Sequence, residues 1–182
     1  RHVLTVGSVL TVYAATGVSR LQIDTNHINF FSPRHPLGES ARIIDTRLRG
    51  IYTFQILLEG PAESIRQPDA VARMDRLEAE LRTLPFVRKV TGLADYVKRI
   101  HRDLGAPGGG PDIPSDAPLI AQELFVFSLA DQGRVELERV AASDFSKGQI
   151  TIKLASMSSD LVFEQINEAE RRAERIFAGS DV

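Results

Sequence analysis

The sequence predicts a protein of the α+β class, and three observations lead to that prediction. Segments whose apolar residues alternate are separated by segments whose apolar residues recur every three or four positions. Helices that lie between strands in this way favour a mixed sheet covered on one face. The chain has 182 residues, 43% of them hydrophobic and none of them cysteine, which suits one domain whose core needs no disulfide.

The N-terminal segment carries no charge between Arg1 and Arg20. A run of ~18–20 apolar residues is long enough to cross a bilayer. We therefore interpret residues 1–19 as a transmembrane helix or the outer part of one. A secretory signal, with small residues at Ala14 and Ala15, and a buried pair of strands remain alternatives.

The segment from residue 21 to residue 60 is expected to form a strand, a helix and a second strand. Residues 21–24 alternate and predict a short strand. A helix is expected from Pro36 to a C-cap at Gly50, because its apolar residues share one face: Leu37, Ala41, Ile44 and Leu48. Residues 52–58 alternate most clearly and predict a strand that Gly60 and Pro61 end.

The middle of the chain predicts a helix, a strand and another helix. Pro68 begins the first helix, whose apolar stripe is Val71, Met74, Leu77, Leu81 and Leu84. Pro85 ends it, and residues 86–90 predict a strand. The next helix has a stripe of Leu93, Val97, Ile100 and Leu104. Residues 105–117, rich in glycine and proline, predict a flexible loop.

The last part of the chain predicts two helical segments, a strand and a long helix. Pro118 begins an apolar helix, and residues 135–142 predict a shorter helical segment. Residues 149–154 alternate and predict a strand. Residues 158–160 offer N-caps for a final helix with a stripe of Val162, Ile166, Ala169, Ala173 and Ile176. This order of elements is best interpreted as a ferredoxin-like βαβ sandwich with extra helices. A doubly wound parallel sheet is the alternative.

The chemistry-bearing residues form no recognisable catalytic or metal-binding pattern. The four histidines, His2, His27, His35 and His101, have no partner at the spacing of a metal-binding helix. The sequence lacks a nucleophile elbow and a phosphate-binding loop. The net charge of −2 disfavours a nucleic-acid partner. We therefore expect no enzymatic activity, no catalytic residue, no metal and no cofactor.

Residues 119–129 are apolar on more sides than a helix on a sheet needs. One interpretation is a core helix. The other is a surface for a lipid-like ligand or a neighbouring domain, with Leu124, Phe125 and Phe127 as the candidate residues for cargo or interface.

Four stretches resemble the extracytoplasmic domain of exporters of the RND superfamily, MMPL type. The first is residues 20–26, followed by Phe30, Phe31 and the Ser32-Pro33 turn. The second joins residues 58–60 to residues 67–69, and the third is residues 84–98. The fourth comprises residues 144–146, the strand 150–154 and residues 157–160. They follow the family's order across almost the whole chain.

The resemblance implies a porter domain at residues 20–182, on the periplasmic side of a bacterial inner membrane. Its partners would be the membrane helices and second outer domain of the same transporter, the membrane through residues 1–19, and hydrophobic or lipid-like cargo. Proton-carrying acids of such exporters lie in membrane helices, so none is assigned here. The alternative is a membrane-anchored periplasmic binding or scaffolding module without transport activity.

Overall fold

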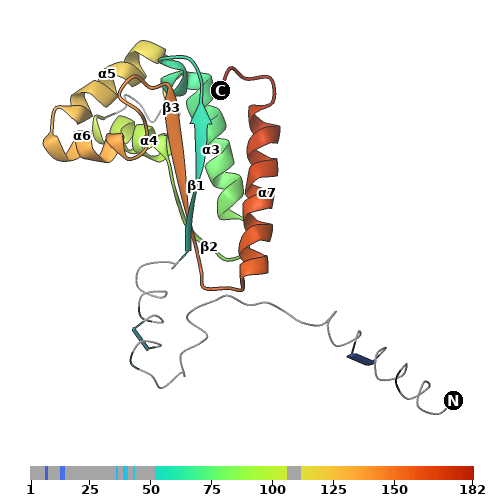
Figure 1. The fold of residues 1–182 in the computed structure, drawn as a ribbon. Coiled ribbons are helices and arrows are strands. Elements are labelled where there is room, and N and C mark those ends of the chain that lie inside the picture. Colours follow the sequence, from blue (N-terminus) through green and yellow to red (C-terminus); the bar gives the residue numbers. More distant parts are fainter. Residues whose placement is uncertain are drawn as a thin grey trace.

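The computed structural model describes residues 52–105 and 112–182, together with isolated helical positions between residues 7 and 43. Within this part of the chain the protein is α+β, with a three-stranded antiparallel sheet and five α-helices (Figure 1). Apart from the helical positions 7, 13 and 14, residues 1–19 lie outside the described residues. The strand predicted at residues 21–24 and the middle of the loop predicted at residues 105–117 lie outside them too.

The central strand of the sheet is the last of the three described strands in the sequence. Strand β1 (Tyr52–Glu59) and strand β2 (Val87–Thr91) both pair antiparallel with β3 (Lys147–Leu154). The order is therefore β1-β3-β2. The mixed sheet expected from helices lying between strands is not observed, because β3 lies between β1 and β2 and every described pair of strands is antiparallel. The doubly wound parallel alternative does not fit this sheet.

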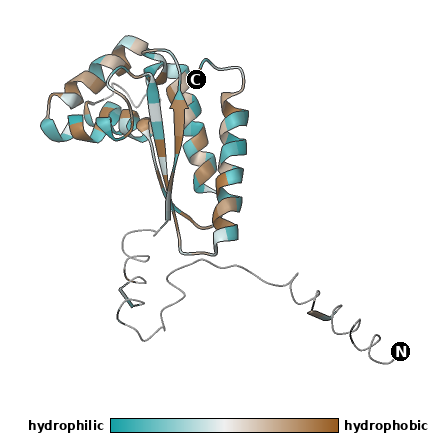
Figure 2. Ribbon diagram, viewed as in Figure 1, coloured by the Kyte–Doolittle hydropathy of each residue, from teal (hydrophilic) through white to brown (hydrophobic). Residues whose placement is uncertain are grey.

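Helices α3 (Pro68–Arg82) and α7 (Ser159–Phe177) cover one face of the sheet (Figure 1). The predicted stripe of α3 is confirmed, since Val71, Met74, Leu77 and Leu81 are fully buried. They meet the inward-facing residues of β3, which are Ile150, Ile152 and Leu154. Figure 2 shows apolar colours on β1, whereas α7 is predominantly hydrophilic along its visible side. This layer holds the main core.

Helices α4 (Leu93–Asp103), α5 (Ala117–Ser128) and α6 (Asp131–Glu138) gather near the end of the sheet where β1 ends and β3 begins (Figure 1). A short 3-10 helix, η1 (Ser64–Arg66), contacts α5 there. The expected stripe of α4 is buried except for Leu104, which is 54% exposed because the helix has already ended.

The helical segment predicted at residues 135–142 is observed as α6, which begins at Asp131 and ends at Glu138. The helix ends at Glu138 because the chain then turns toward the sheet, where Ala141 forms an isolated bridge with Gly148. Gln149 N–H also donates to Val140 O at 2.8 Å. The backbone after α6 therefore pairs with the start of β3, and these residues cannot continue the helix.

Candidate functional site

Helix α5 is apolar on two sides, and only one of them is covered by described residues. Ile120 and Leu124 are buried in the core. Phe125, Val126 and Leu129 are 63%, 43% and 69% exposed. Large exposed apolar patches commonly mark surfaces that bind a ligand or another protein. The outward side of α5 is therefore the best candidate for a functional surface in the described part of the chain.

A hollow of about 300 Å³ lies beside Phe125. Leu124, Phe125 and Leu137 form apolar walls from α5 and α6. Phe145, on the segment before β3, also lines it. Residues of opposite charge, Arg66, Arg134 and Glu138, stand among the lining residues. The hollow thus combines apolar walls with charged groups, as binding sites for amphiphilic molecules do.

The two arginines that line this hollow differ in their contacts with neighbouring side chains. Arg66 is ion-paired with Glu63 and lies over the ring of Phe145, at 5.3 Å from its centroid. Arg134 lies 3.5 Å from both Asp131 and Glu138, and all three side chains are exposed. Exposed ion pairs contribute at most ~1 kcal/mol. Arg134 is therefore the guanidinium more readily available to a polar or anionic head group.

The three residues predicted to contact cargo or a partner occupy different environments. Leu124 is 2% exposed and lines the inner part of the hollow, while Phe125 stands on its exposed side. Phe127 is half-buried against α4, where its ring lies 6.3 Å from Tyr96 and 5.8 Å from the Arg99 guanidinium. The structure brings Leu124 and Phe125 together and places Phe127 elsewhere.

A buried histidine–glutamate pair joins α4 to α5, and spacing within one helix could not reveal it. His101 Nδ1 lies 2.7 Å from Glu123 Oε1, and both side chains are buried. Glu123 Oε2 is also buried and has no hydrogen-bond partner among the described residues. The sequence signal is a single carboxylate, Glu123, within the apolar run 119–129, and periodicity within one helix does not show which residue of another helix it meets.

A second cluster of charged side chains, of which only Glu78 is fully buried, lies between α3, β2 and the start of α4. Arg82 Nη2 lies 3.1 Å from Glu78 Oε2 and 2.7 Å from Asp95 Oδ2. The side chain of Glu78 is fully buried. The pKa of Glu78 is raised from 4.5 to about 8, mainly by burial and then by the charge of Asp95, while Arg82 acts in the opposite direction. This carboxyl group therefore keeps its proton near neutral pH.

The described residues offer no cluster of three or more His, Asp or Glu side chains that could bind a metal ion. His2, His27 and His35 lie outside them. None of the helices in the described part of the chain has the length and hydropathy needed to span a membrane. Comparison of the sequence with known protein families and with curated proteins finds no match. The fold and site thus define an α+β domain with an exposed apolar surface on α5.

Proposed function

We propose that this chain is the periplasmic domain of a proton-driven RND-type exporter of the bacterial inner membrane, where it guides hydrophobic or lipid-like cargo. The observation that carries the proposal is the exposed apolar side of α5 beside the hollow at Phe125. A domain that guides an apolar molecule through an aqueous compartment needs an exposed apolar surface that can bind it. The ordered resemblance of four stretches supports the family.

The finer fold belongs to the same proposal. In a ferredoxin-like sandwich, two βα units place their helices on one face of an antiparallel sheet. The order β1-β3-β2, with α3 following β1 and α7 following β3, supports that fold. The helices α4 to α6 are then the additions between the two units, and they carry the apolar surface.

The proposed partners are the membrane helices and the second outer domain of the same transporter. Residues 1–19 would attach the domain to the membrane. Phe125 and Leu124 contact cargo in this proposal, whereas Phe127 supports the helix from the side of α4. The exported molecule has an apolar body, and Arg134 favours a polar or anionic head group.

Cargo binding is tested with dansyl-undecanoic acid, a fluorescent fatty-acid probe. The probe should brighten when titrated with the chain, and Phe125→Ser should weaken its binding by about tenfold, since a lost aromatic contact is worth ~1–2 kcal/mol. Phe163→Ser is the matched control, because Phe163 is equally exposed but lies on α7. Equal binding by both variants would contradict the assigned surface.

The exporter function is tested on the complete reading frame. It requires several further apolar spans of ~20 residues and a second related outer domain. A frame with a single apolar span would instead favour the membrane-anchored binding module. In the complete exporter, Phe125→Ser should reduce transport without reducing the amount of protein in the membrane.

A further inference from the structure

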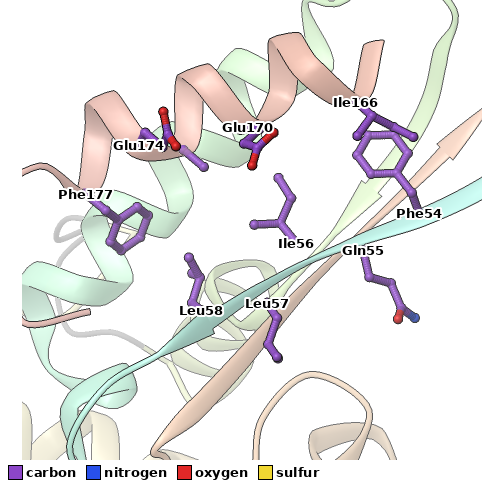
Figure 3. Close-up of a pocket in the computed structure, with 10 residues that line it drawn as sticks. Phe54, Gln55, Ile56, Leu57, Leu58, Ile166, Glu170, Glu174 and Phe177 are labelled. Carbon is purple, nitrogen blue, oxygen red and sulfur yellow. The ribbon is translucent and has the colours of Figure 1, made fainter. Parts of the chain in front are cut away.

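Two hollows in the described part of the chain contain carboxylates that differ in burial. In the groove of about 440 Å³ between β1 and α7, Glu170 and Glu174 are exposed, so water can solvate both (Figure 3). In a hollow of about 380 Å³ between the end of α4 and α5, which we call the α4–α5 hollow, Glu123 is buried. A buried carboxylate needs hydrogen-bond donors within the molecule or from a ligand, whereas a solvated one does not.

The α4–α5 hollow combines an apolar wall with a polar one. Its lining includes three apolar and three polar side chains: Leu104, Leu119 and Val126, and His101, Gln122 and Glu123. Of the polar three, only Gln122 is exposed. Sites for small molecules typically have this composition, with a few polar groups that fix the orientation of a largely apolar ligand.

The carboxylate of Glu123 has one oxygen with a partner and one without. His101 Nδ1 lies 2.7 Å from Oε1, and we assign the proton between them to Nδ1 because an ionised carboxylate only accepts hydrogen bonds. Oε2 is buried and has no partner among the described residues. A buried acceptor without a donor costs free energy, and the cost is larger for a charged group. A ligand that donates a hydrogen bond to Oε2 would remove this cost.

The surroundings of Glu123 favour a cationic donor over a neutral one. The described lining of the α4–α5 hollow contains no Lys or Arg. An imidazole that donates from Nδ1 alone leaves the pair of His101 and Glu123 with one negative charge. The sequence that continues from Gly105, Ala-Pro-Gly-Gly-Gly-Pro at residues 106–111, has no side chain that can donate a hydrogen bond. A cationic ligand would supply both the donor and the complementary charge.

We propose that the α4–α5 hollow binds a small primary ammonium compound with a short apolar body. The ammonium group donates hydrogen bonds to Glu123 Oε2 and to the side-chain oxygen of Gln122. The apolar body packs against Leu104, Leu119 and Val126. The volume lies near the lower end of the ~300–1,000 Å³ range of ligand sites, so the ligand is small.

This site is separate from the surface assigned to cargo. The α4–α5 hollow shares no described lining residue with the hollow at Phe125, which lies on another side of α5. The two hollows also select opposite charges, since Arg134 lines one and Glu123 lines the other. The inference therefore does not depend on the exporter function.

Hexylamine is the probe that tests the proposal, and 1-hexanol and hexanoate are its neutral and anionic controls. Nuclear magnetic resonance titration of the full chain should shift the backbone amides of Gln122, Glu123 and Val126 with hexylamine. Binding of either control should be at least tenfold weaker, because charge-assisted hydrogen bonds are roughly twice as strong as neutral ones. Equal binding of 1-hexanol would overturn the preference for a cation. No binding of hexylamine, or shifts confined to other residues, would overturn the site.

Two variants assign the binding to the residues of the hollow. Glu123→Gln should weaken hexylamine binding by about tenfold or more, because the amide keeps the shape of the side chain but not its charge. Glu164→Gln, at an exposed position of α7, is the matched control and should bind as the unchanged chain does. Equal binding by both variants would overturn the proposal.

Val126→Trp tests the hollow without changing the buried pair. Val126 is 43% exposed, so the fold should tolerate the larger side chain, which should occupy the hollow and abolish hexylamine binding. Circular dichroism checks that every variant is folded. Unchanged hexylamine binding by a folded Val126→Trp variant would place the ligand elsewhere and overturn the proposal.

Discussion

Glu78 is a carboxyl group held inside the core by neighbours from later in the chain. Gly92, at the turn from β2 into α4, comes so close that a Cβ there would lie 2.4 Å from Glu78 Oε1. Asp95 and Glu78 share Arg82, which cannot neutralise both. The sequence could not show that Glu78 is buried while the other acids of α3 face solvent. The residues that cover it, Gly92 and Asp95, come from the turn between β2 and α4 and from the first residues of α4.

The free energy of unfolding should therefore fall as the pH rises from 4.5 to about 8, the range between the ordinary and the folded pKa of Glu78. The folded pKa of about 8 lies above the ordinary value of 4.5, so the folded state binds this proton more tightly than the unfolded state. The contribution is fully favourable below pH 4.5 and is lost as the pH rises to about 8. The difference corresponds to at most about 5 kcal/mol.

Glu78→Gln should remove that decline, as measured by urea unfolding at a series of pH values. The amide cannot ionise, so the free energy of unfolding should stay nearly level across this pH range. Glu164→Gln, at an exposed position of α7, should retain the decline of the unchanged protein. A Glu78→Gln variant that retains the decline would show that another group causes it.

Phe125 and Phe127 should separate binding from stability, although they are two residues apart. Phe127 is half-buried against Tyr96, so Phe127→Ser should cost ~2 kcal/mol of unfolding free energy, about half the cost of emptying a fully buried aromatic site. Phe125 is 63% exposed, and Phe125→Ser should cost less than ~1 kcal/mol. Chemical denaturation measures both. A large loss of stability in Phe125→Ser would make that ring part of the core and leave no exposed cargo residue among the predicted three.

At the scale of elements, the packing of α6 on α5 depends on a residue without a side chain. Gly133 lies in α6, and a Cβ there would be 2.0 Å from the backbone carbonyl oxygen of Phe127. A flexible side chain could move away, but a backbone carbonyl at the end of α5 cannot move without shifting the helix. Close contact between the helices therefore requires glycine at this position.

Gly133→Ala should destabilise the protein, although alanine ordinarily stabilises a helix by ~1 kcal/mol relative to glycine. Overpacking typically costs ~1–3 kcal/mol, which exceeds that gain. The midpoint of urea unfolding should fall, and probe binding at the hollow should weaken because Leu137 on α6 lines it. Gln132→Ala, at the neighbouring exposed position, provides the control. A stabilised Gly133→Ala variant would mean that α6 adjusts freely against α5.

Local patterns in the sequence predicted most of the described helices and strands, but not which of them lie side by side in the fold. Pro68 and the buried stripe from Val71 to Leu81 defined α3, and strict alternation defined β1. The pairing of β3 between β1 and β2 was not predictable, because alternation shows which side chains face a core and not which strands are adjacent. The pair His101–Glu123 was missed for a similar reason, since it crosses between helices.

At the scale of the whole molecule, the described residues already form a continuous core. It joins α3, α4, α5, β3 and α7 through side chains such as Leu77, Val97, Leu124 and Ile152. Arg172 Nη1 donates to Glu80 O at 2.7 Å and ties α7 to α3. The helices, the sheet and the apolar surface on α5 therefore belong to one cooperative unit.

Removal of residues 1–19 should leave this unit folded, because the described core is built by residues from Tyr52 onward and the proposed membrane segment would add little to it. The shortened chain should be more soluble in water, and its thermal transition should remain cooperative with a nearly unchanged midpoint. Differential scanning calorimetry of both chains measures this, and the hydrogen exchange of Ile150 and Ile152 amides reports on the sheet. If the shortened chain no longer melts cooperatively, residues 1–19 supply part of the core, and the buried pair of strands replaces the membrane helix as the interpretation of that segment.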